Sequence, residues 1–310
     1  MIAGVDIGGT KIAVGMVEEH GRVLSRLDSP TNASSGFARA IERIAEMLRE
    51  TARSAGAEIS GIGIGCTGPV DPFSGTIGEV DFLPGWQGQN PVCELERIFG
   101  VPVAMENDAD AAALGEVGWG EGKGKRSLLY ITVGTGIGGG IILDGHLYRG
   151  VGQAHPEIGH HVIDSSGPLC SCGAHGCWEV LARGPAMVEW VKNAAAADYP
   201  HREGLTAKRI CELSGQGDEL SCRAVEREAH YLGLGLANLV TLFAPEAIVL
   251  GGGVMESASL FWNGMQSVIR RNCGLVPFEK TALARSSLGT DAAIIGAARV
   301  WHHRFPEGRD

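Results

Sequence analysis

Short apolar runs separated by glycine-rich turns occupy two distant stretches of the chain. Residues 2–24 (IAGVDIGGTKIAVGMVEEHGRVL) and residues 128–150 (LLYITVGTGIGGGIILDGHLYRG) follow one plan: an apolar run, a Gly/Thr turn, a second apolar run, a turn with glycine, and a third short run. Such runs of β-forming residues broken by glycine turns are typical of consecutive hairpin strands. Aligning the two stretches places Asp6 opposite Thr132. The repeat predicts two similar lobes that face each other.

Helical spacing replaces this pattern between and after the two stretches. In residues 36–56 apolar side chains recur at Phe37, Ile41, Ile44 and Leu48, which predicts an amphipathic helix. Further predicted elements are a buried strand ending in a loop (59–71), a strand, polar turn and Ala-rich helix (101–120), helices at 205–213, 222–243 and 290–303, and a strand opening into a glycine turn (246–254). Strands that alternate with helices predict an α/β fold.

Composition narrows the class of protein. The chain has 310 residues, 44% of them hydrophobic and 20% charged, as in a soluble globular protein with one large or two medium domains. A net charge of −10 argues against a nucleic-acid surface. The N-terminus shows no signal-peptide pattern, and the apolar segment from Tyr231 is too short to span a bilayer. We therefore expect a cytoplasmic protein that binds neither nucleic acid nor membrane.

Cysteines in a reducing compartment are not expected to form a disulfide framework. Five of the eight are scattered singly, and each is predicted to be a small buried residue: Cys66, Cys93, Cys211, Cys222 and Cys273.

The first glycine turn, DIGGTK (6–11), places an acid, two glycines, a hydroxyl and a lysine together. Backbone amides at Gly8 and Gly9 can approach phosphate oxygens, and Asp6 can hold Mg²⁺ directly or through water. The alternative is an ordinary glycine-rich β-turn. The candidate nucleotide-binding residues at this turn are Asp6, Gly8, Gly9, Thr10 and Lys11.

The second turn, GTGIGGG (134–140), contains the spacing G-x-G-x-x-G. A Rossmann dinucleotide site requires a helix directly after these glycines, whereas a strand follows here. Two phosphate-binding hairpins suit a nucleoside triphosphate better than NAD. LGGGV (250–254) is a weaker third signal, either a floor under the nucleoside or a plain turn. The candidates in these two turns are Thr132, Gly134, Thr135, Gly136, Gly252 and Gly253.

Three cysteines, Cys170, Cys172 and Cys177, lie in one short glycine-containing loop, a spacing that favours a tetrahedral metal. His160 or His161 could supply the fourth ligand. Three thiolates and an imidazole close the shell, so the site suits structural zinc better than catalytic zinc. A chance cluster of thiols is the alternative. The other histidines of the block, His155 and His175, are expected to support the site or to lie at the surface.

The chain resembles the sugar kinases of the ROK family, within the actin-like ATPase superfamily. The resemblance runs from Asp6 nearly to the C-terminus and rests on DIGGTK, ENDADAAALGE, GTGIGGG and the E-I-G-H…C-S-C-G…G-C-W-E block. It implies a two-lobed α/β fold of the ribonuclease H-like type with a cleft between the lobes. Residues 1–117, completed by a C-terminal helix at 290–310, would form the small lobe, and residues 118–289 the large lobe with the zinc loop.

The resemblance also implies roles for individual residues. The zinc ligands would be His160, Cys170, Cys172 and Cys177. The sugar would be held by Gly68 through its backbone, by Asn107 and Asp108, and near its anomeric carbon by Glu157, His160 and Glu179. ATP, Mg²⁺ and structural Zn²⁺ are the implied cofactors.

Asp108 has two competing interpretations. The resemblance makes it the general base for the hydroxyl that is phosphorylated, because a carboxylate can accept that proton as the phosphoryl group transfers. The sequence alone favours an ordinary N-cap at the start of the Ala-rich helix.

The implied activity is ATP-dependent phosphorylation of a hexose, with glucose converted to glucose 6-phosphate. FLPGWQGQNP (82–91) resembles a loop of the family's glucokinases, whereas His155-Pro156 before Glu157 departs from them and occurs in fructokinase-like members. Fructokinase, N-acetylmannosamine or N-acetylglucosamine kinase, and a sugar-sensing regulator remain alternatives. The family's repressors carry a DNA-binding segment ahead of the sugar domain, and we expect none here. A homodimer or homotetramer is expected.

Overall fold

The computed structural model describes residues 1–306 and divides the chain into two compact units. The first unit comprises Met1–Tyr130, Gly140–Pro156 and the C-terminal segment from Ser286; the second comprises Ile131–Gly139 and Glu157–Arg285. The lobe boundary that we predicted after residue 117 differs from this division, since residues 118–130 and 140–156 belong to the first unit. The last four residues of the predicted helix 290–310 lie outside the described residues.

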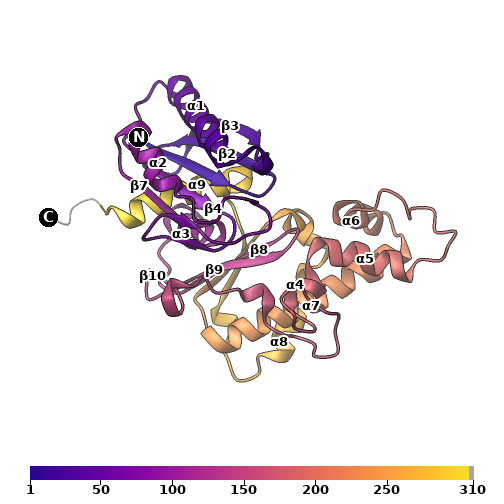
Figure 1. Ribbon diagram of the computed structural model, residues 1–310. Helices are drawn as coiled ribbons and strands as arrows, with labels where there is room; N and C mark the ends of the chain where they lie inside the picture. The colour runs from indigo at the N-terminus through magenta and orange to yellow at the C-terminus, as the bar shows by residue number, and fades with distance from the viewer. Residues whose placement is uncertain (307–310) are drawn as a thin grey trace. The chain divides into compact units, whose positions relative to one another are not determined.

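A five-stranded sheet in the order β3-β2-β1-β4-β7 forms the centre of the first unit (Figure 1). Its strands are β1 (Ile2–Ile7), β2 (Lys11–Val17), β3 (Val23–Pro30), β4 (Gly61–Cys66) and β7 (Val103–Asn107). β1, β2 and β3 are antiparallel neighbours, whereas β1, β4 and β7 run parallel. The register pairs Ile7 with Cys66 and Cys66 with Asn107. The loops after β1, β4 and β7 therefore leave the same edge of the sheet, where α/β proteins bind ligands.

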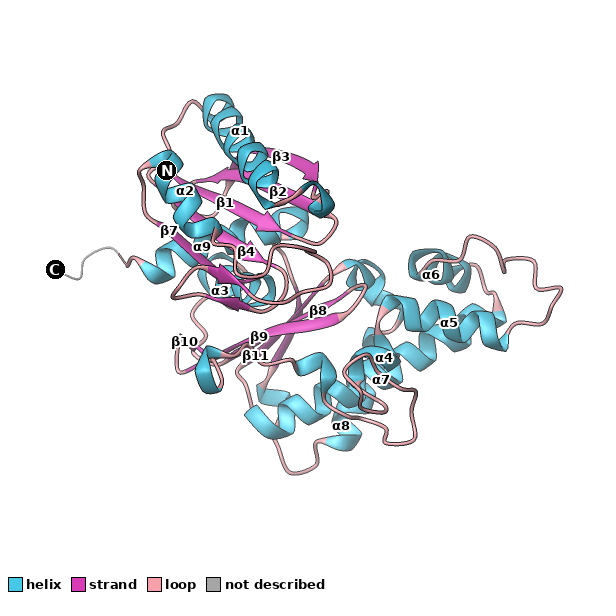
Figure 2. Cartoon of the chain, viewed as in Figure 1, coloured by secondary structure: helices cyan, strands magenta, loops and turns pink. Residues whose placement is uncertain are grey.

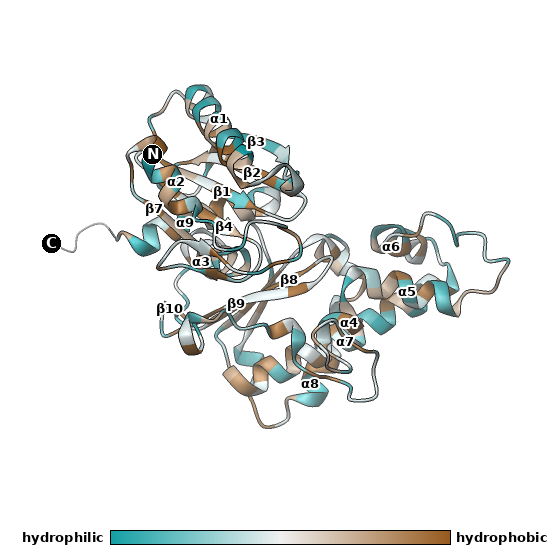
Figure 3. Ribbon diagram, viewed as in Figure 1, coloured by the Kyte–Doolittle hydropathy of each residue, from teal (hydrophilic) through white to brown (hydrophobic). Residues whose placement is uncertain are grey.

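Helices cover both faces of this sheet (Figure 2). One face carries α1 (Phe37–Ala55) and α2 (Pro91–Phe99), and the other carries α3 (Asp108–Trp119) and α9 (Ala292–Arg304). In α1 the buried side chains include Ile41, Ile44 and Leu48, as the helical spacing predicted, and Phe37 is partly buried against the same core. Hydrophilic residues occur among the remaining positions (Figure 3). The yellow helix α9 lies against the indigo strands, so the end of the chain completes the unit that its beginning starts (Figure 1).

The side chains of β1 point alternately to the two faces of the first sheet. Val5 and Ile7 belong to the core on the α1 side, whereas a Cβ atom on Gly4 would collide with the carbonyl oxygen of Ile294 in α9. Glycine at this position lets the helix backbone approach the strand closely. Because side chains alternate along a strand, Asp6 points to the same face as Gly4, the face that α3 and α9 cover.

The second sheet has the order β10-β9-β8-β11-β12, and the boundary between the units passes within β8 and β9. Its strands are β8 (Leu128–Val133), β9 (Ile137–Leu143), β10 (His146–Leu147), β11 (Ala247–Gly251) and β12 (Ala282–Arg285). β8, β9 and β10 follow the same strand–turn–strand plan as β1, β2 and β3, which confirms the predicted repeat. The predicted α/β character is likewise confirmed.

The helices of the second unit are α4 (Trp178–Ala182), α5 (Gly184–Ala194), α6 (Ala207–Gly215), α7 (Glu219–Phe243) and α8 (Trp262–Asn272). A small hairpin, β5 (Val70–Asp71) and β6 (Thr76–Ile77), and 3₁₀ segments complete the elements: Ala33–Ser35, Val151–Gln153, Ile158–His160, Gly253–Leu260, Phe278–Lys280 and Gly289–Asp291. The pattern predicted α6, α7, α9 and β11, but not α2, α5 or α8. Within residues 1–306 no helix is long and apolar enough to cross a membrane.

The eight cysteines are all free thiols. Cys66, Cys211 and Cys273 are buried as predicted, but Cys93 is exposed and Cys222 is only partly buried. The prediction was wrong for Cys93 because α2 turns that residue to solvent and buries Leu95 instead.

Candidate active site

Asn107 caps helix α3, and Asp108 is the first residue of that helix. The side-chain Oδ1 of Asn107 accepts hydrogen bonds from the N–H groups of Ala109 (2.9 Å) and Asp110 (3.4 Å). These are donors that a helix N-terminus otherwise leaves unpaired. The interpretation of Asp108 as the N-cap is therefore wrong. Oδ1 of Asp108 accepts from the N–H of Ala109 (2.9 Å), which holds the carboxylate at the helix start.

Gly68 lies beside Asn107 at the same edge of the sheet. The amide Nδ2 of Asn107 donates to the carbonyl oxygen of Gly68 at 3.3 Å. Gly68 has φ 88°, and a Cβ atom there would lie 2.6 Å from the side chain of Val80. The structure thus brings together Gly68, Asn107 and Asp108, three of the predicted sugar-binding residues, in the first unit.

Asp6 and Asp108 influence each other electrostatically. Burial first, and then the negative charge of Asp108, raise the pKa of Asp6 to about 7, while Lys11 opposes the rise. Burial likewise raises the pKa of Asp108, against hydrogen bonding from Ala109 and the positive influence of His155. Burial first, then Asp108 and Asp6, raises the pKa of the Cys66 thiol. Two acids with raised pKa values at one sheet edge suit a base and a site for a divalent cation.

The first glycine turn is braced by its own hydrogen bonds. Gly8 N–H donates to the Lys11 carbonyl oxygen (2.9 Å), and the Thr31 hydroxyl donates to the Gly8 carbonyl oxygen (2.6 Å). Lys11 Nζ lies 3.3 Å from Asp28 Oδ1. The expectation that the Gly8 amide faces a phosphate does not agree with this geometry, since the turn uses that N–H. A Cβ atom on Gly9 would lie 2.7 Å from the side chain of Phe82.

The second turn is tied to Glu179 within the second unit. Ile137 N–H donates to Oε2 of Glu179 at 2.9 Å, and Gly184 N–H donates to the Gly134 carbonyl oxygen at 2.8 Å. A Cβ atom on Gly136 would lie 2.5 Å from the same carboxylate oxygen. One carboxylate therefore connects a candidate phosphate turn with a candidate sugar-binding residue. This connection was not visible in the sequence.

The third turn ends β11. Gly252 has φ 90°, and its Cα passes so close to the backbone of Val133 that a Cβ atom would collide with it. Gly252 also accepts the N–H of Met255, which starts the 3₁₀ segment Gly253–Leu260. The glycine pair thus lies next to the end of β8, from which the second turn departs.

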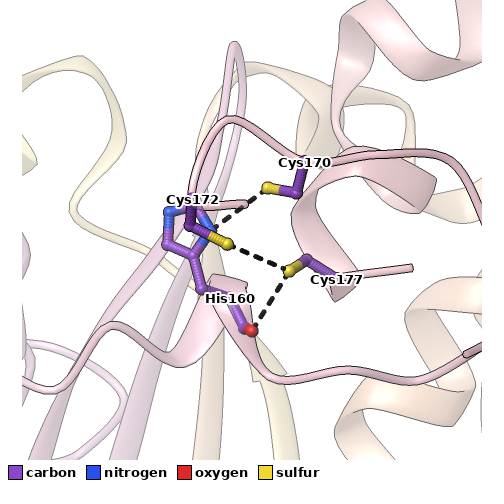
Figure 4. A group of neighbouring side chains, drawn as sticks. All are labelled: His160, Cys170, Cys172 and Cys177. Carbon is purple, nitrogen blue, oxygen red and sulfur yellow. Dashed lines mark hydrogen bonds between the residues drawn. The ribbon is translucent and has the colours of Figure 1, made fainter. Parts of the chain in front are cut away.

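His160, Cys170, Cys172 and Cys177 form a cluster whose donor atoms all lie within 4.8 Å of one another. Figure 4 shows the imidazole and the sulfur atoms pointing toward one another. Nδ1 of His160 lies 3.4 Å from Sγ of Cys170, and Sγ of Cys172 lies 3.5 Å from Sγ of Cys177. Around tetrahedral zinc with Zn–S bonds of about 2.3 Å, sulfur atoms lie roughly 3.8 Å apart. The four donors therefore fit a zinc ion.

Of the two candidate histidines, His160 belongs to the cluster. Nδ1 of His161 instead lies 2.5 Å from the carbonyl oxygen of Ile158, and its ring contacts Trp178. Because Nδ1 of His160 faces the thiols, its Nε2 points away from them and can donate to a ligand. Burial raises the pKa of Cys177 to about 12, whereas the backbone of Ala174 and the thiol of Cys177 lower the pKa of Cys172.

Backbone geometry and one tryptophan hold the cysteine loop in place. Gly176 has φ 68°, and a Cβ atom there would collide with the carbonyl oxygen of Asp164, so only glycine fits. Trp178, directly after the last cysteine, is fully buried, and its Nε1 donates to the Tyr231 carbonyl oxygen in α7 at 3.0 Å. The loop is thereby anchored to the core of the second unit at one end.

Glu157 stands one 3₁₀ turn before His160, whose N–H donates to the Glu157 carbonyl oxygen at 3.0 Å. The structure therefore places Glu157, His160 and Glu179, the remaining predicted sugar-binding residues, around the cysteine cluster and the second turn. All three belong to the second unit.

Sequence reasoning missed one buried pair in the first unit. Nδ1 of His155 lies 2.9 Å from Oδ2 of Asp110, and the two side chains are 13% and 3% exposed. His155 was expected only to support the site or to lie at the surface. No local signal connects residues that are so far apart in sequence, although Asp110 follows Asp108 closely.

One protein family matches the chain over nearly its whole length. The profile of the ROK family matches residues 2–304. A glucokinase of Streptomyces coelicolor is 37% identical over 312 residues, which cover 95% of this chain and 95% of that protein. The crystal structure of a ROK hexokinase from Thermus thermophilus is similar with a TM-score of 0.82 and 38% identity, covering 96% of this chain and 97% of that chain. A ROK family glucokinase from Streptomyces griseus in complex with glucose and AMPPNP gives 0.81 and 34%, with the same coverage. The structural similarity confirms the predicted fold class.

Proposed function

Because this chain belongs to the ROK family, we propose that it is an ATP-dependent hexose kinase that phosphorylates glucose to glucose 6-phosphate. The likeness to a ROK glucokinase in complex with glucose and AMPPNP, across 96% of the chain, supports both substrates. The observation that carries the proposal is Asp108, a partly buried carboxylate whose pKa is raised, held at the start of α3 next to Asn107 and Gly68.

Asp108 is the general base in this proposal. Its Oδ1 is engaged by the N–H of Ala109, which leaves Oδ2 to accept the proton of the attacking hydroxyl. A raised pKa brings the carboxylate nearer to the pH at which it works, so that it is a stronger base than an exposed aspartate. Asn107 has one side-chain N–H left after its hydrogen bond to Gly68, and this N–H can hold a neighbouring hydroxyl.

Side chains of the second unit also contribute sugar contacts in this proposal. Glu179 offers Oε1, since Oε2 already accepts the N–H of Ile137. The Glu179 carboxylate also holds the second turn. If sugar binding moves this carboxylate, the backbone of the turn, which is proposed to bind phosphate, moves with it. His160 contributes Nε2, and Glu157 completes the set.

Two metal ions belong to the proposal. Mg²⁺ bound with ATP would be held at Asp6, where it would relieve the cost of burying that charge. Zinc would be held by His160, Cys170, Cys172 and Cys177, and supplies rigidity rather than a reactive water, because the four ligands close its shell. The residues around the His160 and cysteine cluster, above all Trp178, then keep the side chains of His160 and Glu179 in position.

A fructokinase of the same family is the second candidate. The observation in its favour is His155-Pro156 ahead of Glu157, with His155 buried rather than at the surface. A cytoplasmic location and a homodimer or homotetramer are further parts of the proposal, supported by eight free thiols and by the family resemblance.

The test is ADP release by purified protein with Mg-ATP and a panel of glucose, mannose, fructose, N-acetylglucosamine and N-acetylmannosamine. We expect the highest kcat/KM with glucose. Preference for fructose would favour the second candidate, and sugar binding without sugar-dependent ADP release would identify a sensor instead of a kinase.

A further inference from the structure

The buried pair of His155 and Asp110 lies next to the proposed base. Asp110 follows Asp108 in the first turn of α3, and its Oδ2 lies 2.9 Å from Nδ1 of His155, which comes from the segment that ends at Pro156. The side chain of Asp110 is 3% exposed and that of His155 13%. Oδ1 of Asp110 is buried and has no hydrogen-bond partner among residues 1–306. A pair that leaves a carboxylate oxygen unsatisfied is costly to fold, so stability alone is a poor reason for it.

Charge around Asp108 is mostly negative. Asp6 on β1 and Asp110 on α3 are acids, whereas the Asn107 side chain and the Cys66 thiol on β4, whose pKa burial raises, are neutral. Lys11 on β2 acts on Asp6 with the opposite charge. His155 acts on Asp108 in the opposite direction, because its positive form favours the ionised carboxylate. The ion-pair contact with Oδ2 of Asp110 holds the Nδ1 side of the imidazole toward α3.

We propose that His155, clamped by Asp110, is a positioning residue that balances the negative charge beside Asp108 and keeps this base ionised and correctly placed for the reacting hydroxyl. The proposal rests on the proposed kinase function. In this proposal Asp110 orients His155. Of these three residues, only Asp108 contacts the substrate.

His155→Gln is the first test variant, because glutamine keeps a hydrogen-bonding group next to Asp110 but carries no charge. Without the imidazole the base protonates at higher pH, so the acid limb of the kcat profile moves upward by about one pH unit, and kcat falls about tenfold at the low-pH end. At the alkaline end kcat stays within about twofold of the wild type, because Asp108 is ionised there in both proteins. His146→Gln, which changes an exposed histidine of the same unit, is the matched control and keeps the wild-type profile.

The Asp110→Asn variant distinguishes the orienting contact to His155 from the positive charge of His155. This variant removes a negative charge near Asp108, so its acid limb does not move upward; kcat instead falls at every pH because the imidazole is no longer held. A His155→Gln profile that overlays the wild type, or a loss equal at all pH values, would overturn the proposal. If His155→Gln fails to fold, His155→Asn and Asp110→Asn carry the same comparison.

An NMR titration of histidine side chains provides a readout that needs no turnover. Interacting groups shift each other's titration, so replacing Asp108 by asparagine lowers the pKa of His155. An unchanged His155 titration would contradict the inference even if the kinase is active. Absence of sugar-dependent ADP release in the wild type would instead overturn the proposed function, with the His155 titration still decisive for the pair.

Discussion

Replacing Asp108 by asparagine is predicted to abolish most turnover and at the same time to stabilise the protein. The substitution keeps the size of the side chain and its hydrogen bond from the N–H of Ala109, but removes a partly buried negative charge. Asp6, whose pKa is raised to about 7 by burial and by Asp108, loses the second of these two causes. The same charge that makes the base effective therefore destabilises the folded state, a conflict typical of active sites.

The sign and size of the stability effect follow from the pKa of Asp6. A carboxyl that titrates near 3.8 when unfolded and near 7 when folded costs nothing below pH 4 and increasingly more as the pH rises to 7. Three pKa units correspond to about 4 kcal/mol at pH 8. Asp108 is the second cause of this shift after burial, so we expect Asp108→Asn to recover about 1–2 kcal/mol at pH 8. For a chain of this size that gain raises Tm by roughly 2–5 °C.

Two assays check both halves of this prediction. Steady-state ADP release with glucose should show kcat reduced by about 10²- to 10⁴-fold, the usual contribution of a general base. Thermal unfolding in magnesium-free buffer should show the variant more stable at pH 8 and equal to the wild type at pH 4. Asp144→Asn, an exposed acid in the turn between β9 and β10, is the control and should change neither quantity. Turnover above one tenth of the wild type, or a lower Tm at pH 8, would refute the reasoning.

Three further predictions concern the second unit. Cys172→Ser should lower the zinc content found by elemental analysis and raise the KM for glucose, whereas Cys93→Ser, an exposed thiol on α2, should do neither; zinc retained at one ion per chain would contradict the ligand set. Glu179→Gln should raise the KM for both glucose and ATP, because its carboxylate also accepts the Ile137 N–H; initial-rate kinetics with each substrate varied would show a change in glucose alone if this connection is unimportant. Glu228→Gln removes a fully buried carboxyl whose oxygens have no hydrogen-bond partner in the described chain and whose pKa burial raises well above its usual value. Because such a group destabilises the fold increasingly as pH rises above its unfolded pKa, the variant's Tm should exceed that of the wild type more at pH 8 than at pH 5, and an equal difference at both would count against this explanation.

The sequence predicted helices and strands correctly where the spacing of apolar residues and the residue types in the turns indicate the same element. The repeat of strand, glycine turn and strand is encoded by neighbouring residues, as is the apolar face of α1. Helix α2 was missed although Asn90 and Pro91 form an N-cap and a first-turn proline, signals that could have found it. Asn107 and Asp108 are both good caps, so sequence could not decide which one ends the strand; the register of β7 against β4 decides it.

Contacts between distant residues account for what the sequence could not provide. The hydrogen bond from Ile137 to Glu179 and the pair of His155 and Asp110 form only when the chain has folded. The availability of the Gly8 amide also depends on the hairpin, which pairs Gly8 with Lys11. The cysteine cluster was more predictable because three of its ligands lie in one loop, yet the choice of His160 over His161 required the geometry around Ile158.

Transfer of labelled phosphate from γ-labelled ATP to glucose by the purified, zinc-containing protein is the most direct measurement of the central claim. The account predicts label in glucose 6-phosphate with the wild type and almost none with Asp108→Asn. Label that appears only as inorganic phosphate, or equally in the product of both proteins, would contradict it.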